Sequence, residues 1–469
     1  MKTYKPTIGL EIHAELKTQT KMFCKSLNDP EEKRPNVNIC PVCMAHPGTL
    51  PVINKAAVKH VLKVGKAINA ELADVTEFDR KNYFYPDIPK GYQISQHKYP
   101  LVSGGNLAGV DITRIHLEED TARSSHEGEH SLVDFNRAGV PLMELVTEPV
   151  VGDAKTAVRF AKELQLLLRY LGASDANMEK GEMRVEANIS VSNTNAFGTK
   201  VEIKNLNSFR VVERAILHEI ERQTKLIESG GEVVQETRGW DETKQKTFSQ
   251  RKKENSDDYR YFPDPDLPKL RLSELAELST SALAEEMPEL PWEKRARYAD
   301  VYGLKEEDIE SYVVDAGLGR FFEDVVSVLG VDRDTIKLAS NYITSDLAGL
   351  IKGDTAGSFP DSKDFATLIT MAKGGDISSR ATKDILAIMY VSGGEPAHIA
   401  KDRGLLQQSD EGEIEKIVEG ILAEHESVAE EFKAGKESAL QFLIGQGMKA
   451  TKGSANPQIL KKIFEAKLK

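Results

Sequence analysis

Residues 8–16 read Ile8-Gly9-Leu10-Glu11-Ile12-His13-Ala14-Glu15-Leu16, an alternation of apolar and polar side chains. The even positions are apolar, whereas the odd positions after Gly9 carry Glu11, His13 and Glu15. Successive side chains of a β-strand point to opposite faces of its sheet. The pattern therefore predicts a strand with one face on a core and one face rich in ionisable groups.

Three further segments repeat this alternation, and each predicts a strand with one polar face. Their polar sides carry Arg184, Glu186, Asn188 and Ser190 in 183–191, Lys200, Glu202 and Lys204 in 200–204, and Arg114, His116 and Glu118 in 113–120, where Glu119 falls on the other side. An antiparallel sheet with one solvated face would look the same. Carboxylates with an imidazole also suit Mg²⁺, and neighbouring cations suit phosphate, so a nucleotide site is the second interpretation.

The chain has 469 residues, 40% of them hydrophobic, and a formal net charge of −12. At roughly 100–200 residues per domain, this length predicts about three domains. The acidic balance argues against polyanion binding driven by bulk charge, so any nucleic-acid contact must be a local patch. No apolar run reaches about 18 residues and the N-terminus lacks an apolar leader, so we expect a soluble cytoplasmic protein without a membrane partner.

Alternating segments give way to segments of helical period near residue 290, where Pro288-Glu289-Leu290-Pro291 disfavours a continuous helix. Further on, two amphipathic stripes predict helices of a small bundle. The stripes are Ile414, Ile417, Val418, Ile421 and Leu422, and, after the start signal Asn456-Pro457, Ile459, Leu460, Ile463 and Phe464. With a candidate linker at 401–404, we expect domains at 1–292, 293–402 and 403–469.

Segment 79–96 mixes cations, aromatic rings and amides, and segment 257–266 combines aromatic rings with Arg260 and several acids. Each segment is either a hydrated loop with a few rings in the core or part of a nucleotide site. In the second interpretation Lys81 of the first segment meets a phosphate, and the rings stack on a base. The residues alone leave both interpretations open.

The three cysteines Cys24, Cys40 and Cys43 are too few for a disulfide framework and fit a reducing compartment. Cys40-Pro41-Val42-Cys43 is half of a zinc knuckle. With Cys24, three thiolates would hold Zn²⁺ if His46 or a carboxylate supplied the fourth ligand. Ordinary reduced cysteines explain the pattern equally well.

With these residues in view, the chain resembles the B subunits of the tRNA-dependent amidotransferases, which convert Glu-tRNA(Gln) to Gln-tRNA(Gln) and Asp-tRNA(Asn) to Asn-tRNA(Asn). The resemblance runs from Ile8 to the end of the chain. It rests on the motifs at 9–13, 79–87, 116–120, 134–137, 187–190, 204–209, 258–263 and 448–457.

The resemblance implies an α+β fold, in which a curved antiparallel sheet forms a catalytic cradle resembling glutamine synthetase and the guanidino kinases. All-α helical and tail domains follow, and the tail is implied to hold the tRNA. The implied reaction uses ATP to phosphorylate the side-chain carboxylate of the misacylated amino acid, after which ammonia displaces phosphate. The ammonia is implied to come from a glutaminase (A) subunit, and a small (C) subunit is implied to complete a heterotrimer.

The resemblance also implies roles for individual residues. Glu11, His13 and one carboxylate of Glu118-Glu119-Asp120 would bind Mg²⁺. We favour Glu119, although strict alternation favours Glu118, so Glu119 requires a local bulge or an opposite assignment of faces. Lys81 is expected to join these three in catalysis and to meet a phosphate of ATP. Glu186 and Glu202 would hold a second metal or the nucleotide, and Lys204 would meet the nucleotide.

Two further implied sites lie elsewhere in the chain. Zinc-containing relatives carry Cys-x-Cys before Cys-x-x-Cys, whereas this chain reads Cys24-Lys25-Ser26 and lacks one ligand. For the tRNA we expect Lys449, Lys452, Lys461 and Lys462, because residues 445–469 hold six lysines against one acid. A merely solvated basic terminus is the alternative.

Two other functions compete with this interpretation. A small-molecule ligase on the same sheet would turn over ATP without tRNA. A non-catalytic tRNA-binding scaffold would keep its role when Glu11 and His13 are replaced. The sequence leaves open whether Glu-tRNA(Gln), Asp-tRNA(Asn) or both are substrates.

Overall fold

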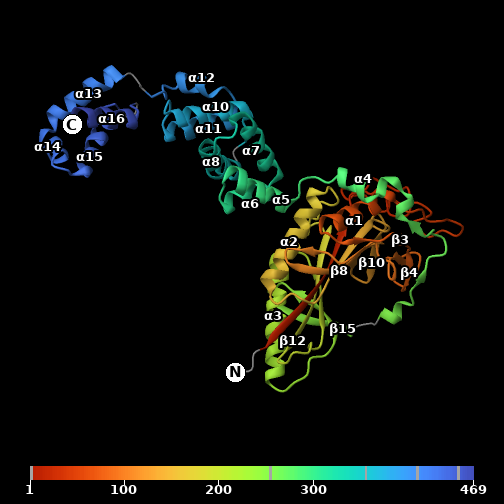
Figure 1. The fold of residues 1–469 in the computed structure, drawn as a ribbon. Coiled ribbons are helices and arrows are strands. Elements are labelled where there is room, and N and C mark those ends of the chain that lie inside the picture. Colours follow the sequence, from red (N-terminus) through yellow and green to blue (C-terminus); the bar gives the residue numbers. More distant parts are fainter. Residues whose placement is uncertain (1–3, 253–255, 354–355, 408–410, 452–454, 469) are drawn as a thin grey trace. The chain divides into compact units, whose positions relative to one another are not determined.

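A computed structural model of the chain describes residues 4–252, 256–353, 356–407, 411–451 and 455–468. The chain divides into two compact units, Met1–Pro291 and Trp292–Lys469. The first mixes strands and helices, whereas the described elements of the second are all helical (Figure 1). The expected division into three domains stays a prediction.

Ten strands of the described residues form one large sheet in the first unit, in the order β15-β14-β13-β12-β1-β11-β8-β6-β2, with β7 beside β8. Their bounds are β1 (Lys5–Glu15), β2 (Glu71–Leu72), β6 (Val102–Ser103), β7 (Asn106–Leu107), β8 (Val110–Glu119), β11 (Pro141–Thr147), β12 (Met183–Ser192), β13 (Val201–Leu206), β14 (Glu236–Asp241) and β15 (Lys246–Lys252). The four strands predicted from alternation are β1, β8, β12 and β13, so those predictions are confirmed.

The sheet is mixed, so the prediction of a wholly antiparallel sheet is wrong at one pair. Strands β13 and β14 run parallel, with Glu202 opposite Thr237. Helix α3 (Phe209–Glu228) connects them, and parallel neighbours need such a crossover because a tight turn cannot join them. The likeness to glutamine synthetase stays a prediction.

Helices α1 (Lys55–Ala67), α2 (Ala154–Tyr170) and α3 cover the apolar face of the sheet, and Figure 1 shows α2 and α3 along it. Ile8, Leu10 and Ile12 of β1 have no exposed surface on this side. The alternation that predicted the strand thus puts its apolar half under the helices and leaves Glu11 and His13 on the other face.

Shorter elements complete the first unit. They are the sheet β16 (Phe262–Pro263), β4 (Asp79–Asn82), β5 (Tyr92–Ser95), the pair β17 (Leu270–Arg271) and β3 (Val75–Thr76), the hairpin β9 (Arg123–Glu127) and β10 (His130–Asp134), helix α4 (Thr280–Glu285), and 3₁₀ turns at Ser256–Tyr259, Leu272–Glu274 and Ala276–Leu278. The pairing of β4 with β16 brings the two aromatic and cationic segments of the sequence together.

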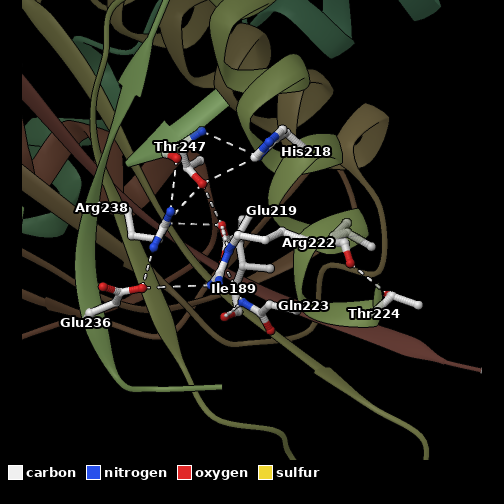
Figure 2. Close-up of polar contacts among 10 residues, drawn as sticks. Ile189, His218, Glu219, Arg222, Gln223, Thr224, Glu236, Arg238 and Thr247 are labelled. Atoms are coloured by element: carbon white, nitrogen blue, oxygen red, sulfur yellow. Dashed lines mark hydrogen bonds and ion pairs between the residues drawn. The ribbon is translucent and has the colours of Figure 1, made fainter. Parts of the chain in front are cut away.

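A buried polar network fixes α3 to strands β14 and β15 (Figure 2). The side chain of Glu219 on α3 has no exposed surface, and it accepts hydrogen bonds from Arg222 at 2.6 Å and from Thr247 at 3.0 Å. Arg238 of β14 donates to the Thr247 hydroxyl at 3.0 Å. Because a buried carboxylate needs such partners, the network holds β14 in one position.

The second unit contains α5 (Pro291–Arg297), α6 (Glu306–Val314), α7 (Ala316–Leu329), α8 (Arg333–Asn341), α9 (Ala348–Lys352), α10 (Ser362–Gly374), α11 (Ser379–Ser392), α12 (Pro396–Asp402), α13 (Glu411–Glu424), α14 (Glu426–Lys433), α15 (Glu437–Ala450) and α16 (Pro457–Leu468), with π-helical turns at Tyr298–Tyr302 and Tyr342–Leu347. Both predicted amphipathic helices are present, as α13 and α16. Val418 and Phe464 are fully buried in the core shared by the last four helices. No helix among the described residues combines the length and apolarity needed to cross a membrane.

We predict that Glu219→Gln lowers the free energy of unfolding of the first unit by about 3 kcal/mol, because Arg222 and Arg238 lose a fully buried anionic partner and keep only the carboxylate of Glu236 among the described residues. Urea unfolding followed by Trp240 fluorescence measures this in a Trp292→Phe background. The matched control is Glu221→Gln on the same helix, whose carboxylate pairs with Lys225 at the surface. Equal destabilisation by both variants would contradict the prediction.

Candidate active site

The polar face of the large sheet carries a row of ionisable side chains across four strands. In the strand register, His13 of β1 lies opposite Arg184 of β12 on one side and Glu144 of β11 on the other. Glu144 in turn lies opposite His116 of β8. Directly opposed residues point to the same face, so these side chains meet above the sheet.

Glu144 is shared by two imidazoles. Its Oε2 atom lies 3.4 Å from His13 Nε2 and 3.3 Å from His116 Nε2. His13 Nε2 is also 3.8 Å from an oxygen of Glu118 and 4.0 Å from one of Glu11. We call Glu11, His13, His116, Glu118 and Glu144 the carboxylate–imidazole cluster.

Electrostatics inside the cluster shift several pKa values. Burial alone would lower the pKa of His13, but its hydrogen bond and attraction to Glu144 outweigh this and raise the pKa to about 9. Burial, with repulsion from Glu144 and Glu186, raises the pKa of Glu11 to about 7. Burial opposes ionisation of Glu144 too, yet the two imidazoles bring its pKa well below the usual range.

At the β13 end of the cluster, Lys204 faces two more carboxylates. Its Nζ atom lies 2.7 Å from Glu186 and 3.8 Å from Glu202. Burial would lower the pKa of Lys204, but the two carboxylates outweigh it and raise the pKa. The hydroxyl of Thr237 donates to Glu202 at 2.7 Å, so β14 orients this carboxylate.

At the opposite, β8 end, Lys81 of β4 approaches the cluster. Burial would lower its pKa, whereas attraction from Glu118 and Glu144 outweighs burial and raises it. Its ammonium lies 4.9 Å from the ring centre of Tyr259. The structure thus brings together Glu11, His13, Lys81, Glu186, Glu202 and Lys204, all of them predicted site residues.

Glu119 is not brought to this cluster. It is hydrogen-bonded to Lys90 and accepts from the backbone N–H of Ile94 at 2.9 Å, beside a cavity of about 310 Å³. The register between β8 and β11 is regular from Arg114 to Glu119, so the local bulge that Glu119 required is not there. Alternation places Glu118, not Glu119, beside His13.

Sequence reasoning missed Glu144 altogether. It is the one charged residue in the otherwise apolar stretch Pro141-Leu142-Met143-Glu144-Leu145-Val146. An isolated acid in a buried strand has a large desolvation cost unless partners neutralise it. That signal was available, but the histidines that neutralise Glu144 lie on other strands.

The donor set of this cluster fits a divalent cation. Ligand atoms lie within 4.8 Å of one another in each of three overlapping groups, namely Glu11–His13–Glu144, His116–Glu118–Glu144 and Glu11–Glu186–Glu202. Carboxylate oxygens with few imidazoles are the ligands of hard cations such as Mg²⁺ and Mn²⁺. In addition, the Nδ1 atom of His116 is buried and has no hydrogen-bond partner among the described residues.

The three cysteines also come together, with ligand atoms within 4.8 Å. The sulfurs of Cys40 and Cys43 are 3.8 Å apart, the spacing expected of two thiolates each about 2.3 Å from a tetrahedral zinc. In the described part of the chain no His, Asp or Glu joins them as a fourth ligand. Instead the Ser26 hydroxyl and the Lys21 ammonium each lie 3.8 Å from the Cys43 sulfur.

The predicted tRNA-binding lysines fall on the last two helices. Lys449 is near the end of α15, and Lys461 and Lys462 are exposed on α16, whereas Lys452 lies outside the described residues. Lys467, which also counted toward the basic tail, is paired with Glu415 and Glu419 of α13 at 2.6 Å each. Part of the local positive charge is therefore neutralised within the tail.

Comparison with known protein families assigns both units. Residues 6–276 match the family described as the GatB/GatE catalytic domain, and residues 320–468 match the family described as the GatB domain. The chain belongs to the GatB/GatE family. All residues of the carboxylate–imidazole cluster lie inside the GatB/GatE catalytic domain.

Curated relatives within this family cover nearly the whole chain. A protein of Persephonella marina is 44% identical over 99% of this chain and 100% of its own length. A protein of Coxiella burnetii is 42% identical over 99% and 100%, and one of Crocosphaera subtropica is 41% identical over 98% and 97%. Each is named as the B subunit of an aspartyl/glutamyl-tRNA(Asn/Gln) amidotransferase, so the resemblance inferred from the motifs is confirmed.

We predict that Ser26→Cys turns the three-cysteine cluster into a four-thiolate zinc site. A fourth thiolate should raise zinc affinity by more than the roughly 10–100-fold that an outer-shell partner contributes. The measurement is competition with a chromogenic chelator, with Ser26→Ala as the matched control. If Ser26→Cys and Ser26→Ala release zinc to the chelator equally, residue 26 does not occupy the fourth ligand position of the zinc.

Proposed function

We propose that this chain is the B subunit of a tRNA-dependent amidotransferase and that it activates the side-chain carboxylate of a misacylated tRNA with ATP. The observation that carries the proposal is the carboxylate–imidazole cluster centred on Glu144, inside the family's catalytic domain. The full-length relatives that bear this name support the choice of substrate.

The chemistry explains why a cluster of this kind is needed. The γ-phosphoryl group moves from ATP to an oxygen of the glutamyl or aspartyl side chain, leaving ADP and an acyl phosphate. Ammonia then attacks the acyl carbon, expels inorganic phosphate and loses a proton to give the amide. Phosphoryl transfer depends on positioned positive charge, because the group itself offers little covalent chemistry.

We propose Glu11, His13, Glu118 and Glu144 as the residues that hold Mg²⁺, with Glu118 in place of Glu119. When bound there, Mg²⁺ would neutralise charge on the transferring phosphoryl group. Glu186 and Glu202 would complete the nucleotide end of the site. Lys81 and Lys204, one at each end, would bind and orient anionic groups, since both stay protonated at neutral pH.

Partners follow from the same chemistry. Amide formation needs ammonia, and the sequence carries neither a Gly/Ser-rich amidase signature nor a cysteine glutaminase motif. We propose that a glutaminase (A) subunit supplies ammonia, that a small (C) subunit completes the heterotrimer, and that the enzyme works in the cytoplasm. The lysines of α15 and α16 would hold the tRNA through its phosphates.

We predict that Glu144→Gln lowers ADP release from Mg-ATP, measured in the assembled enzyme with Glu-tRNA(Gln), by on the order of 10²-fold or more, the scale on which positioned charges act. Glu11→Gln should have a similar effect. Glu221→Gln, on α3 and outside the cluster, is the control and should match wild type.

The alternatives give different results in the same assay. ADP release that does not depend on the charged tRNA would favour a small-molecule ligase on this sheet. Unchanged ADP release in both Glu144→Gln and Glu11→Gln would reduce the chain to a tRNA-binding scaffold. Replacing the tRNA by Asp-tRNA(Asn) tells which amino acid the site accepts.

A further inference from the structure

Two aromatic segments that are far apart in sequence form one surface beside the candidate active site. Strand β4 pairs with β16, with Arg80 opposite Phe262. The side-chain amide of Asn82 donates to the carbonyls of Tyr259 at 3.2 Å and Arg260 at 2.8 Å. These bonds fasten the second segment to the first.

Aromatic rings on this surface form a continuous series of ring-to-ring contacts. Tyr83 and Tyr259 meet edge to face with centroids 6.2 Å apart, as do Tyr259 and Tyr261 at 6.0 Å. Tyr261 stacks on His97 at 4.2 Å with an interplanar angle of 7°. We call Tyr83, Tyr259, Tyr261 and His97 the aromatic wall.

Specific side-chain contacts hold the aromatic wall in place. Arg80 lies over the ring of Tyr92 at 4.2 Å and forms ion pairs with Asp264 at 2.8 Å and Asp266 at 2.9 Å, which fixes the chain just beyond the wall. Arg260 has a φ of 48°, a conformation that non-glycine residues rarely adopt. Such backbone strain concentrates at functional sites when the surroundings enforce it, as Asn82 does here.

Lys81 connects the wall to the carboxylate–imidazole cluster. Its ammonium lies 4.9 Å from the centre of the Tyr259 ring and is attracted most strongly by Glu118. The three tyrosines are only partly buried, and the neighbouring Phe84 is 83% exposed. Partly exposed rings beside a cation offer a nucleobase a stacking face, with charge for the adjoining phosphate.

We propose that the aromatic wall seats the 3′-terminal adenosine of the misacylated tRNA. This inference rests on the proposed function. The reacting carboxylate is joined to the terminal ribose by a single amino acid, so the terminal base must lie close to the cluster. The wall is close, because β4, which carries Lys81, pairs with β5, and Ser95 of β5 donates to Glu118 of the cluster at 3.2 Å.

ATP carries the same base, but we expect that base at the other end of the cluster. Its base is separated from the reacting γ-phosphoryl group by the ribose and two further phosphates. The wall approaches the cluster from the β8 end through Lys81, whereas Lys204 serves the β13 end with Glu186 and Glu202. The two anionic substrates therefore enter from opposite ends of the cluster.

The test uses the full-length chain and a fluorescent base. A tRNA ending in 2-aminopurine riboside, whose fluorescence falls on stacking, is titrated with wild type, Tyr259→Phe and Tyr259→Leu. Wild type and Tyr259→Phe should quench the probe. Tyr259→Leu should lose the quench and bind the tRNA roughly 5–100-fold more weakly, the value of one base stack. Phe197→Leu, an exposed ring in another loop, is the control and should match wild type.

A parallel titration with 2-aminopurine riboside triphosphate distinguishes the two sources of the base. The proposal stands if Tyr259→Leu changes only the tRNA signal. It is overturned if the triphosphate signal is the one that depends on Tyr259, or if neither probe responds to the substitution. Tyr261→Leu repeats the test if Tyr259→Leu does not fold.

Failure of the proposed function gives a different result. In that case the wild-type assembly does not release ADP in response to charged tRNA, whatever the fluorescence shows. Normal ADP release without stacking on Tyr259 would overturn only the inference about the wall.

Discussion

The ionised side chain of Glu144 sets the main constraint on this structure. A carboxylate buried in the middle of an apolar strand is strongly destabilising unless other groups neutralise it. Here His13 and His116, each on a neighbouring strand, approach the same oxygen within 3.4 Å. The arrangement exists only when β1, β11 and β8 pair in one register. A slip of a single residue would turn one imidazole to the opposite face.

The rest of the first unit maintains that register. The apolar halves of the strands are covered by α1, α2 and α3, so any slip would also expose core residues. The network around Glu219 then fixes β14, and β14 presents Thr237 to Glu202 at 2.7 Å. Packing on one face of the sheet thereby determines the positions of charged groups on the other face.

Alternation in the sequence was enough to predict β1, β8, β12 and β13 and to put Glu11, His13 and Glu118 on polar faces. The choice of Glu119 followed the resemblance against the alternation, and the structure places Glu119 beside Lys90 and not in the cluster. Glu144 was missed because its partners are set by strand pairing, which periodicity within one segment cannot reveal. The parallel pairing of β13 with β14 was missed for the same reason, because the crossover through α3 leaves no signal in the sequence of either strand.

Charge balance explains why the cluster has a cation at each end. Five carboxylates, those of Glu11, Glu118, Glu144, Glu186 and Glu202, share this face with the two lysines Lys81 and Lys204. Burial, with repulsion from Glu144 and Glu186, raises the pKa of Glu11 to about 7. A nucleoside triphosphate and a substrate carboxylate would add further negative charge. Under the proposed function, Lys81 and Lys204 would offset that charge from the two ends of the cluster, and a divalent cation would offset the carboxylates between them.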